Sequence, residues 1–291
     1  MAPLVLITGA AGLIGHYLLK TAPRWAPRWE VRGITRQDVD LTDVACLSGV
    51  VRSLNPLAII HCAALSRTKD CEQDPESARR INVEVTAHIA QLSQDIPFLF
   101  LSSGEVFDGR TGWYGETDEP NPINVYGRTK LQAEQAVLQN PRHTVVRIVL
   151  TAGTSEAGDR SFVEDMCRTA KAGKDVTLYA DEFRCPLPAG VIARVIWELV
   201  DFKQSGLYHL GGSERLSRWE IGQVLLSWYP DLEGRLVQDS ARNHTGAPRP
   251  ADLSLRCDKI QRLLSFRIPG FREWLAGRPR RGPDPWDYIA P

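Results

Sequence analysis

A tyrosine and a lysine four residues apart form the first candidate reaction centre in the sequence. They are Tyr126 and Lys130 in the segment Tyr-Gly-Arg-Thr-Lys, and residues i and i+4 lie on one face of a helix. A lysine ammonium beside a phenol favours the phenolate. We therefore predict a lowered pKa for Tyr126, which would make it a proton donor or acceptor near neutral pH. Lys130 can also reach a cofactor ribose. Ser103 ends an earlier apolar run, and its hydroxyl would bind a substrate carbonyl oxygen.

A glycine-rich segment near the N-terminus is suited to holding phosphate groups. Its sequence, TGAAGLIG at 8–15, has the spacing G-x-x-G-x-x-G and lies between an apolar run and a helical pattern. The first glycines permit a tight turn and a close approach of a pyrophosphate, and the last lets helix and strand pack closely. The helix N-terminus adds N–H groups and partial positive charge. We therefore predict dinucleotide binding at Gly9, Gly12, Leu13, Ile14 and Gly15.

The residues that follow the second predicted strand favour one nicotinamide cofactor over the other. NAD-preferring sites carry an acid here that binds the ribose 2′-hydroxyl. Residues 31–37 contain no acid, whereas Arg36 is available to pair with a 2′-phosphate. We therefore predict NADP(H) as the preferred cofactor, with NAD(H) as the alternative. Asp40 and Leu41 come next, and an aspartate there would accept from the adenine amino group or cap the following helix.

Alternating apolar runs and helical patterns predict the fold that must position these residues. Strands separated by helices imply βαβ units, a parallel sheet and right-handed crossovers. We therefore predict an α/β fold, a doubly wound Rossmann sheet with a smaller C-terminal substrate lobe. The first predicted strand covers 4–7, the second ends near 33–36, and the later ones cover 57–60, 98–101 and 145–150; the predicted helices cover 13–21, 78–92 and 126–138.

The pattern loosens after residue 150, which indicates a second structural unit. A Gly/Ser/Thr-rich stretch at 151–160 is typical of a loop. Ser217 and Glu220 have the spacing of a helix capping box. We expect a dinucleotide-binding domain at 1–150, to which 187–210 returns. Residues 151–186 and 211–291 would form the substrate lobe and tail. Further helices are predicted at 162–172, 191–202 and 217–229, with strands at 176–179 and 207–210.

A tandem tetrapeptide, Ala-Pro-Arg-Trp at 22–25 and again at 26–29, lies between the first helix and the second strand. Two copies are too few for a solenoid. We predict a lengthened loop there and assign it no function.

The composition excludes several classes of partner. Lys plus Arg equals Asp plus Glu at 35 each, so net charge gives no reason to expect nucleic acid or a membrane surface. The six cysteines form no C-x-x-C pair and have no zinc-ligand spacing, so we predict no metal site and reduced thiols in a cytoplasmic protein. We also predict no signal peptide and no membrane span.

Taken in order, the motifs resemble those of extended short-chain dehydrogenase/reductases, and within them the dTDP-4-dehydrorhamnose reductase group. The resemblance extends from about residue 4 to about residue 274. It rests on TGAAGLIG at 8–15, DLTD at 40–43, NPLAIIHCAA at 55–64, INVEVT at 81–86, LSSGEVFDG at 101–109, PNPINVYGRTK at 120–130, DEFRCP at 181–186, YHLGG at 208–212 and RPADLSLRCDKI at 249–260.

This resemblance implies a role for each matching residue. Ser103, Tyr126 and Lys130 would form the catalytic triad, and Asn82 would support a proton-relay water or else make an ordinary backbone contact. Arg184 and Arg249 match segments that close over a nucleotide sugar, with Arg184 as a diphosphate contact or a surface ion pair. The loop beneath the cofactor would be Cys62, Ala63 and Ala64.

The sequence also departs from the group at the predicted substrate pocket. The group usually has S-T-D-Y-V-F-D-G after the strand that is predicted here at 98–101, whereas this chain has Ser-Ser-Gly-Glu-Val-Phe-Asp-Gly at 102–109. Serine can replace threonine chemically. Gly104 and Glu105 replace an acid and a tyrosine and change the pocket wall, so this departure bears on the choice of sugar rather than on the hydride chemistry.

The resemblance implies an NADPH-dependent reductase of a 4-keto-6-deoxy nucleotide sugar, and a homodimer is compatible with it. One alternative is a non-catalytic NADP-binding regulatory protein, because the regulatory β subunit of methionine adenosyltransferase resembles the same group. In that reading the Arg/Pro-rich tail at 277–286 would be a docking strand. Another alternative is a nucleotide-sugar epimerase or dehydratase, which the missing acid after the second strand argues against.

Overall fold

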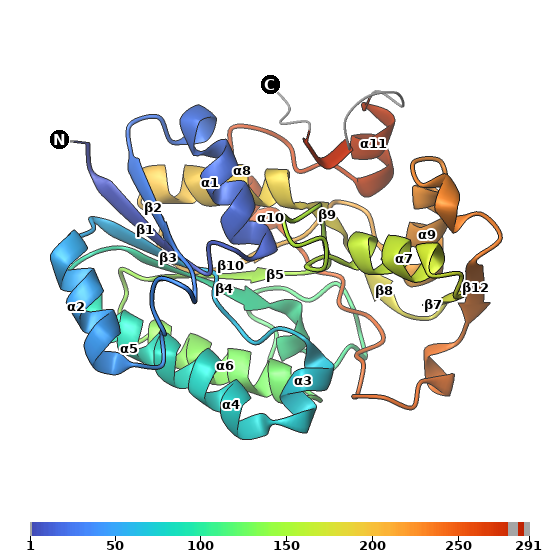
Figure 1. Cartoon of the computed structure of the whole chain (residues 1–291), viewed down its shortest axis with the longest axis horizontal. Helices are drawn as coiled ribbons and strands as arrows, with labels where there is room; N and C mark the ends of the chain where they lie inside the picture. The colour runs from blue at the N-terminus through green and yellow to red at the C-terminus, as the bar shows by residue number, and fades with distance from the viewer. Residues whose placement is uncertain (1, 279–284, 288–291) are drawn as a thin grey trace.

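A six-stranded parallel sheet forms the centre of the computed structural model, which describes residues 2–278 and 285–287 (Figure 1). Its strand order is β10-β5-β4-β3-β1-β2, and each neighbouring pair is parallel. The inner strands are almost continuously apolar because helices cover both faces of the sheet. The bounds are β1 Leu4–Thr8, β2 Glu30–Ile34, β3 Ala58–His61, β4 Phe98–Ser103, β5 Thr144–Ile148 and β10 Gly206–Leu210.

Helices lie on both faces of this sheet, so the predicted doubly wound Rossmann fold is confirmed. On one face α1 (Leu13–Trp25) packs beside α8 (Ala189–Asp201). On the other face lie α2 (Val44–Leu54), α5 (Val85–Leu92) and α6 (Val125–Val137) (Figure 1). The two apolar layers fix the strand ends relative to the helix starts, which positions the site.

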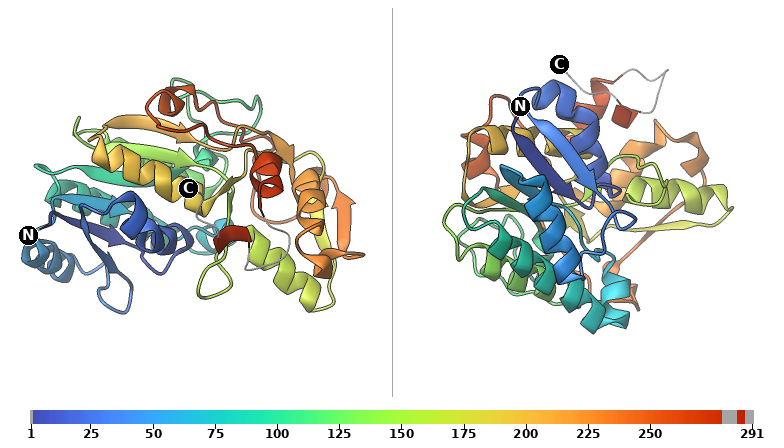
Figure 2. Two further views of the ribbon diagram at one scale, coloured as in Figure 1. Left: turned by 90° about the horizontal axis from the view of Figure 1, so that it is seen from above. Right: turned by 60° about the vertical axis from the view of Figure 1, so that its left-hand side comes forward.

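A smaller lobe lies beside the sheet, at the end where the parallel strands finish (Figure 2). Three two-stranded pairs join its segments: β6 with β9, β7 with β12, and β8 with β11. The capping box at Ser217 and Glu220 is present and opens α9 as predicted. The bounds are β6 Thr151–Ala152, α7 Phe162–Lys171, β7 Val176–Tyr179, β8 Phe183–Arg184, β9 Leu187–Pro188, β11 Leu216–Ser217, α9 Arg218–Leu226, η3 Pro230–Leu232, β12 Leu236–Asp239, η4 Ala241–Asn243, α10 Asp258–Gln261 and α11 Phe271–Ala276.

The connection from β3 to β4 is not the single helix predicted at 78–92. It comprises α3 (Thr68–Gln73), α4 (Pro75–Arg79), a π-helical turn η1 (Arg80–Glu84) and then α5. π-turns inside helices often occur at functional sites. This one contains Asn82, which is buried.

The tandem tetrapeptide does not form the predicted loop in its first copy. Helix α1 continues to Trp25 with Pro23 inside its last turn, where a missing N–H removes one helical hydrogen bond. Packing on α8 compensates, because the Arg194 guanidinium lies 4.4 Å from the Trp25 ring centroid. In the second copy Trp29 Nε1 donates to Asp201 Oδ1 over 2.7 Å. The two tryptophans of the repeat thus contact α8 at different positions, Trp25 at Arg194 and Trp29 at Asp201.

Part of the C-terminal tail packs on the chain itself. Trp286, in the short helix η5 (Pro285–Asp287), is 2% exposed and stacks on Trp274 with ring centroids 5.1 Å apart. Tyr17 donates its hydroxyl to the Trp286 carbonyl oxygen over 3.2 Å. Of the segment proposed as a docking strand, residues 279–284 lie outside the described residues.

Within the described part of the chain, no helix has the length and apolar content needed to cross a bilayer.

Candidate active site

The glycine motif forms a tight turn directly after β1 and against the β3 loop. Gly9 has φ of +71°, and a Cβ on it would lie 2.5 Å from the Ala63 amide nitrogen and 2.9 Å from the Cys62 carbonyl carbon. A Cβ on Gly15 would lie 2.4 Å from the Gly9 carbonyl oxygen. Only glycine fits these positions. The structure therefore brings the glycine motif and the loop that contains Cys62, Ala63 and Ala64 into direct contact.

Arg36 is exposed beyond the end of β2, and the nearby acids are engaged in their own turns. Asp38 accepts from the Thr35 amide and hydroxyl, both over 2.8 Å. Asp40 accepts from the Thr42 amide at 2.9 Å and hydroxyl at 2.8 Å, and these bonds lower the pKa of each aspartate. Asp40 does not cap the following helix, which was one of the two roles considered for it. Asp43 caps α2 instead, and its side chain accepts from the Cys46 amide. Arg36 therefore keeps an accessible guanidinium.

Ser103 and Tyr126 meet at the carboxyl end of β4. Ser103 is the last residue of the strand, and Tyr126 is in the first turn of α6. The Asn124 side chain accepts from the Gly127 amide over 2.8 Å and so caps this helix. A hydrogen bond with Ser103 lowers the pKa of Tyr126, but the larger effect of burial raises it overall. The predicted lowering of the Tyr126 pKa by Lys130 is therefore wrong for this structure.

The orientation of Lys130 explains why it does not lower the pKa of Tyr126. Its ammonium group points at strand β4. Its Nζ donates to the Leu101 carbonyl oxygen over 2.6 Å and lies 3.9 Å from the Phe100 ring centroid. The residue is 2% exposed. Burial lowers the pKa of Lys130 to about 7, against the opposing effect of the Glu134 carboxylate. Lys130 thus titrates in the neutral range and Tyr126 stays a phenol.

Asn82 ties the β3 loop to helix α6. Its Oδ1 accepts from the Leu65 amide over 2.8 Å, and its Nδ2 donates to the Leu65 carbonyl and the Thr129 hydroxyl, both over 3.0 Å. Of the two roles considered for Asn82, these hydrogen bonds match the ordinary backbone contact. They hold the loop after Ala64 against the turn of the helix that precedes Lys130.

The predicted substrate residues lie on the lobe side of Ser103. Gly104 follows it in the short helix η2 (Gly104–Val106). Glu105 accepts from Asn124 Nδ2 over 2.8 Å and lies 3.9 Å from the buried Arg184. Arg184 also donates to the Pro250 carbonyl over 3.1 Å. Arg184 is therefore joined through Glu105 to the end of β4, the strand that carries Ser103.

Sequence reasoning missed Glu182, the carboxylate that gathers the arginines. Its side chain is 1% exposed and accepts from Arg249 through two bonds of 2.8 Å, with Arg184 Nη2 at 3.1 Å. Burial raises the pKa of Glu182, but the hydrogen bond of Arg249 and the charges of the neighbouring arginines lower it overall. Glu182 is therefore an anion between two cations.

Sequence reasoning also missed Arg218, at the start of α9. Its backbone amide donates to the Glu182 carbonyl over 2.8 Å, and its guanidinium carbon lies 4.8 Å from the Phe162 ring centroid. Burial lowers its pKa to about 10, and its Nη1 is buried with no hydrogen-bond partner among the described residues. Unpaired buried donors are rare in native proteins. No short motif marks this residue, because Arg218 meets Glu182 only through folding.

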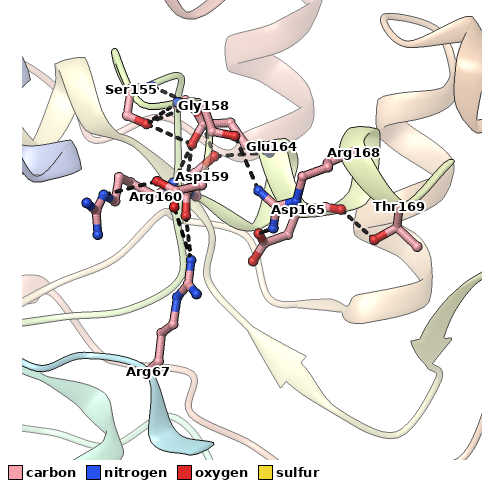
Figure 3. Close-up of polar contacts among 11 residues, drawn as sticks. Arg67, Ser155, Gly158, Asp159, Arg160, Glu164, Asp165, Arg168 and Thr169 are labelled. Carbon is pink, nitrogen blue, oxygen red and sulfur yellow. Dashed lines mark hydrogen bonds and ion pairs between the residues drawn. The ribbon is translucent and has the colours of Figure 1, made fainter. Parts of the chain in front are cut away.

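A loop of the lobe, residues 153–161, contacts the sheet domain at two places, and Figure 3 shows the one made by Arg67. Arg67, from the β3–α3 connection, donates to the Asp159 carbonyl over 3.0 Å. On the other side the His16 ring nitrogen lies 3.7 Å from Glu156. Glu164 accepts from the Ser155 and Arg160 amides at 2.5 and 2.8 Å and fixes the loop.

Among the described residues, no group of three or more His, Cys, Asp and Glu side chains could hold a metal ion.

Comparison with known proteins places the chain among sugar-nucleotide reductases and their relatives. The model of the RmlD substrate binding domain family matches residues 3–278. A dTDP-4-dehydrorhamnose reductase from Sinorhizobium fredii is 30% identical over 282 residues, which are 92% of this chain and 93% of that protein. Methionine adenosyltransferase 2 subunit beta from Bos taurus is 30% identical over 93% of this chain and 86% of its own.

Solved structures agree with this placement. The dTDP-4-dehydrorhamnose reductase from Bacillus anthracis, in complex with NADP, superposes with a TM-score of 0.86 at 25% identity, over 94% of this chain and 97% of that one. UDP-glucose 4-epimerase from Thermus thermophilus, in complex with NAD, has a TM-score of 0.76 at 21% identity and shares the fold.

Proposed function

The chain belongs to the RmlD substrate binding domain family. We propose that it is an NADPH-dependent reductase of a 4-keto-6-deoxy nucleotide sugar. It would then be an oxidoreductase of the extended short-chain dehydrogenase/reductase type. The observation that carries the proposal is the meeting of Ser103 and Tyr126 at the end of β4, with Lys130 one turn along the same helix. The relative solved with NADP, itself a dTDP-4-dehydrorhamnose reductase, supports both cofactor and substrate class.

The glycine turn fits a dinucleotide. Added Cβ atoms at Gly9 and Gly15 would meet backbone atoms at 2.4–2.5 Å, so this backbone already has the close packing that a pyrophosphate cradle requires. The Gly12 amide donates to the Gly9 carbonyl over 2.9 Å and closes the turn, so the first-turn residues Leu13 and Ile14 would present their N–H groups to the phosphates. Arg36 would pair with the 2′-phosphate, which favours NADP(H), and NAD(H) remains the alternative. When bound, the cofactor supplies the hydride.

Ser103 and Tyr126 would act on the substrate carbonyl. The hydroxyl of Ser103 donates a hydrogen bond to the carbonyl oxygen and polarises it. Because burial keeps Tyr126 a phenol, it holds the proton that the oxygen needs as negative charge develops there. Lys130 lies one helical turn from Tyr126, and its positive charge would favour the phenolate that forms when Tyr126 gives up its proton.

The arginines around Glu182 support a diphosphate substrate. Arg184, Arg218 and Arg249 bring three guanidinium groups together around the carboxylate of Glu182, with Glu105 beside Arg184. Guanidinium groups bind phosphate oxygens through paired hydrogen bonds, and the unpaired Arg218 Nη1 needs an acceptor. A nucleotide sugar with its carbonyl at Ser103 would therefore place its diphosphate along Arg184 toward Arg218.

The test is NADPH oxidation by the purified protein against a panel of 4-keto nucleotide sugars, with Tyr126→Phe beside the wild type. We expect turnover on one or more of these sugars and a loss of about 10²–10⁴-fold in kcat for the variant, with NADPH affinity unchanged. Tyr208→Phe is the matched control, because the Tyr208 hydroxyl donates to the Ser205 carbonyl, away from the site. Full activity of Tyr126→Phe would refute the assignment.

A regulatory role is the second candidate, favoured by the similarity to methionine adenosyltransferase 2 subunit beta. Tight NADPH binding without turnover on any ketone, together with a stoichiometric partner after purification, would favour this role over the reductase.

A further inference from the structure

Helix α6 carries a third polar residue on the face that holds Tyr126 and Lys130. Glu134 lies one further helical turn along, at the same spacing of four. It is 1% exposed and Lys130 is 2% exposed. Burying a carboxylate is unfavourable unless it is paired and hydrogen-bonded. The position of Glu134 beside the candidate catalytic lysine therefore needs an explanation.

Two strands clamp the Glu134 carboxylate. Arg147 of β5 donates from Nε at 3.0 and 3.2 Å to the two oxygens and from Nη2 at 2.7 Å. Ser102 of β4 donates its hydroxyl to Oε1. Ser102 and Arg147 are paired neighbours in the β4–β5 register. The carboxylate thus holds α6 to the strand residue that immediately precedes Ser103.

Arg147 is itself fixed from its far side. Its Nη1 lies 3.3 Å from His209 Nε2, and His209 Nδ1 lies 3.0 Å from the Tyr114 carbonyl. Burial and the charge of Arg147 lower the pKa of His209 to about 3, so the ring is neutral, accepts from Arg147 and donates to Tyr114. Since Arg147 cannot turn away without breaking these contacts, Glu134 has one defined geometry.

The other groups that face Lys130 carry no charge at neutral pH. Burial lowers the pKa of His61 to about 3 and raises that of Cys62 to about 12 and that of Cys71 to about 11. The remaining contacts of the ammonium are the Leu101 carbonyl and the Phe100 ring. Of the described groups around Lys130, Glu134 supplies the negative charge.

We propose that Glu134 is a positioning residue of the active site, whose clamped carboxylate keeps Lys130 an ammonium ion and holds the end of β4 in place for Ser103. The catalytic part of this inference rests on the proposed reductase function, because only there does the charge of Lys130 support proton transfer from Tyr126. The electrostatic part concerns Lys130 alone and can be measured without a substrate.

The direction of the effect follows from the sign of the charges. Burial already brings the pKa of Lys130 to about 7, and the Glu134 carboxylate opposes that decrease. Removal of the carboxylate lowers the pKa further, so Lys130 loses its proton at a lower pH. Glu134 lies one helical turn from Lys130, and a nearby opposite charge typically shifts a pKa by about 1–3 units. Activity that needs the ammonium ion then falls at a lower pH.

Glu134→Gln tests the proposal, because the amide retains an oxygen for Arg147 and Ser102 while it removes the charge. Two readouts are combined. The first is the titration of the Lys130 side chain by ¹³C NMR of lysine-labelled protein, with Lys130→Arg used to assign the signal. The second is the pH profile of kcat. Glu198→Gln is the matched control, since Glu198 pairs with Arg194 on α8, away from α6.

We expect the Lys130 titration and the alkaline limb of the kcat profile to move to lower pH by about one unit or more in Glu134→Gln, and to stay in place in Glu198→Gln. An unchanged Lys130 titration in folded Glu134→Gln would overturn the proposal. So would a loss of kcat that is uniform across pH, since that is the behaviour of a purely structural residue. If the wild type turns over no ketone, the reductase function fails, and the NMR titration still decides the role of Glu134.

Discussion

Replacement of Glu182 by glutamine removes the charge that balances the lobe arginines. The substitution keeps the size of the side chain but leaves Arg184, Arg218 and Arg249 facing one another beside a neutral amide. Loss of one partner from a buried ion pair destabilises proteins by about 3–5 kcal/mol. Because the Arg249 side chain is 38% exposed, water screens part of the effect, and we expect about 3 kcal/mol.

The expected change in melting temperature follows from chain length. An unfolding entropy of about 2.1 cal/mol/K per residue gives about 0.6 kcal/mol/K for 291 residues, so about 3 kcal/mol lowers Tm by about 5 °C. Glu84→Gln is the control, because Glu84 forms an exposed pair with Arg79. Exposed pairs contribute about 0–1 kcal/mol, so the control should lower Tm by less than about 2 °C.

The difference between wild type and Glu182→Gln should depend on pH with a defined sign. The neighbouring arginines lower the folded-state pKa of Glu182 below its ordinary value, despite the opposing effect of burial. A depressed carboxyl pKa gives stability that is fully present above the unfolded pKa of about 4.3 and is lost as pH falls through the folded value. The Tm difference should therefore be constant from pH 6 to 8 and should shrink in acid.

Thymidine diphosphate should stabilise the variant more than the wild type. In the wild type Glu182 occupies Arg249 and competes with a phosphate group, whereas in the variant the guanidinium groups are free to bind the ligand. The assay is thermal unfolding over a series of nucleotide concentrations at pH 7, for wild type, Glu182→Gln and Glu84→Gln. Equal stabilisation of all three proteins, or a Tm change in Glu182→Gln no larger than in the control, would refute the reasoning.

Two further predictions concern the cofactor. Gly15→Ala should weaken NADPH binding more than tenfold in a fluorescence titration, because its Cβ would lie 2.4 Å from the Gly9 carbonyl oxygen. Gly49→Ala is the control, since nothing lies within 4 Å of its added Cβ. This variant should bind NADPH normally and gain about 1 kcal/mol of helix stability. Arg36→Ala should weaken NADPH binding about tenfold and leave NADH binding nearly unchanged, as expected for one lost charged hydrogen bond; an equal loss for both cofactors would place the 2′-phosphate elsewhere.

Local sequence signals predicted the sheet domain well because they are short in range. Apolar runs of strand length, helices between them and the glycine turn depend on neighbours within a few residues. The β7 strand and the Ser217 capping box were predicted for the same reason. The loop predicted at the first copy of the tandem tetrapeptide was wrong. Proline favours a helix end, but the packing of Trp25 on α8 keeps Pro23 inside the last turn of α1.

The charge arrangement of the site could not be predicted, because it is made by residues far apart in the chain. Spacing placed Lys130 beside Tyr126, but it did not show that the ammonium points at the Leu101 carbonyl, nor that burial would dominate both pKa values. Glu182 and Arg218 carry no motif of their own. Their meeting depends on how β8 and α9 fold together in the lobe.

The two candidate anion sites lie next to different strands of the sheet, and this placement constrains the substrate. The glycine turn lies after β1, and the arginines are joined to Ser103 through Glu105. If a ketone without phosphate groups were bound, Arg184 and Arg249 would keep their ion pairs with Glu105 and Glu182. Remote binding energy would then contribute nothing to orienting the carbonyl. On the proposed function, a diphosphate would displace those carboxylates from the arginines, and the energy of that exchange would hold the sugar between Tyr126 and the cofactor.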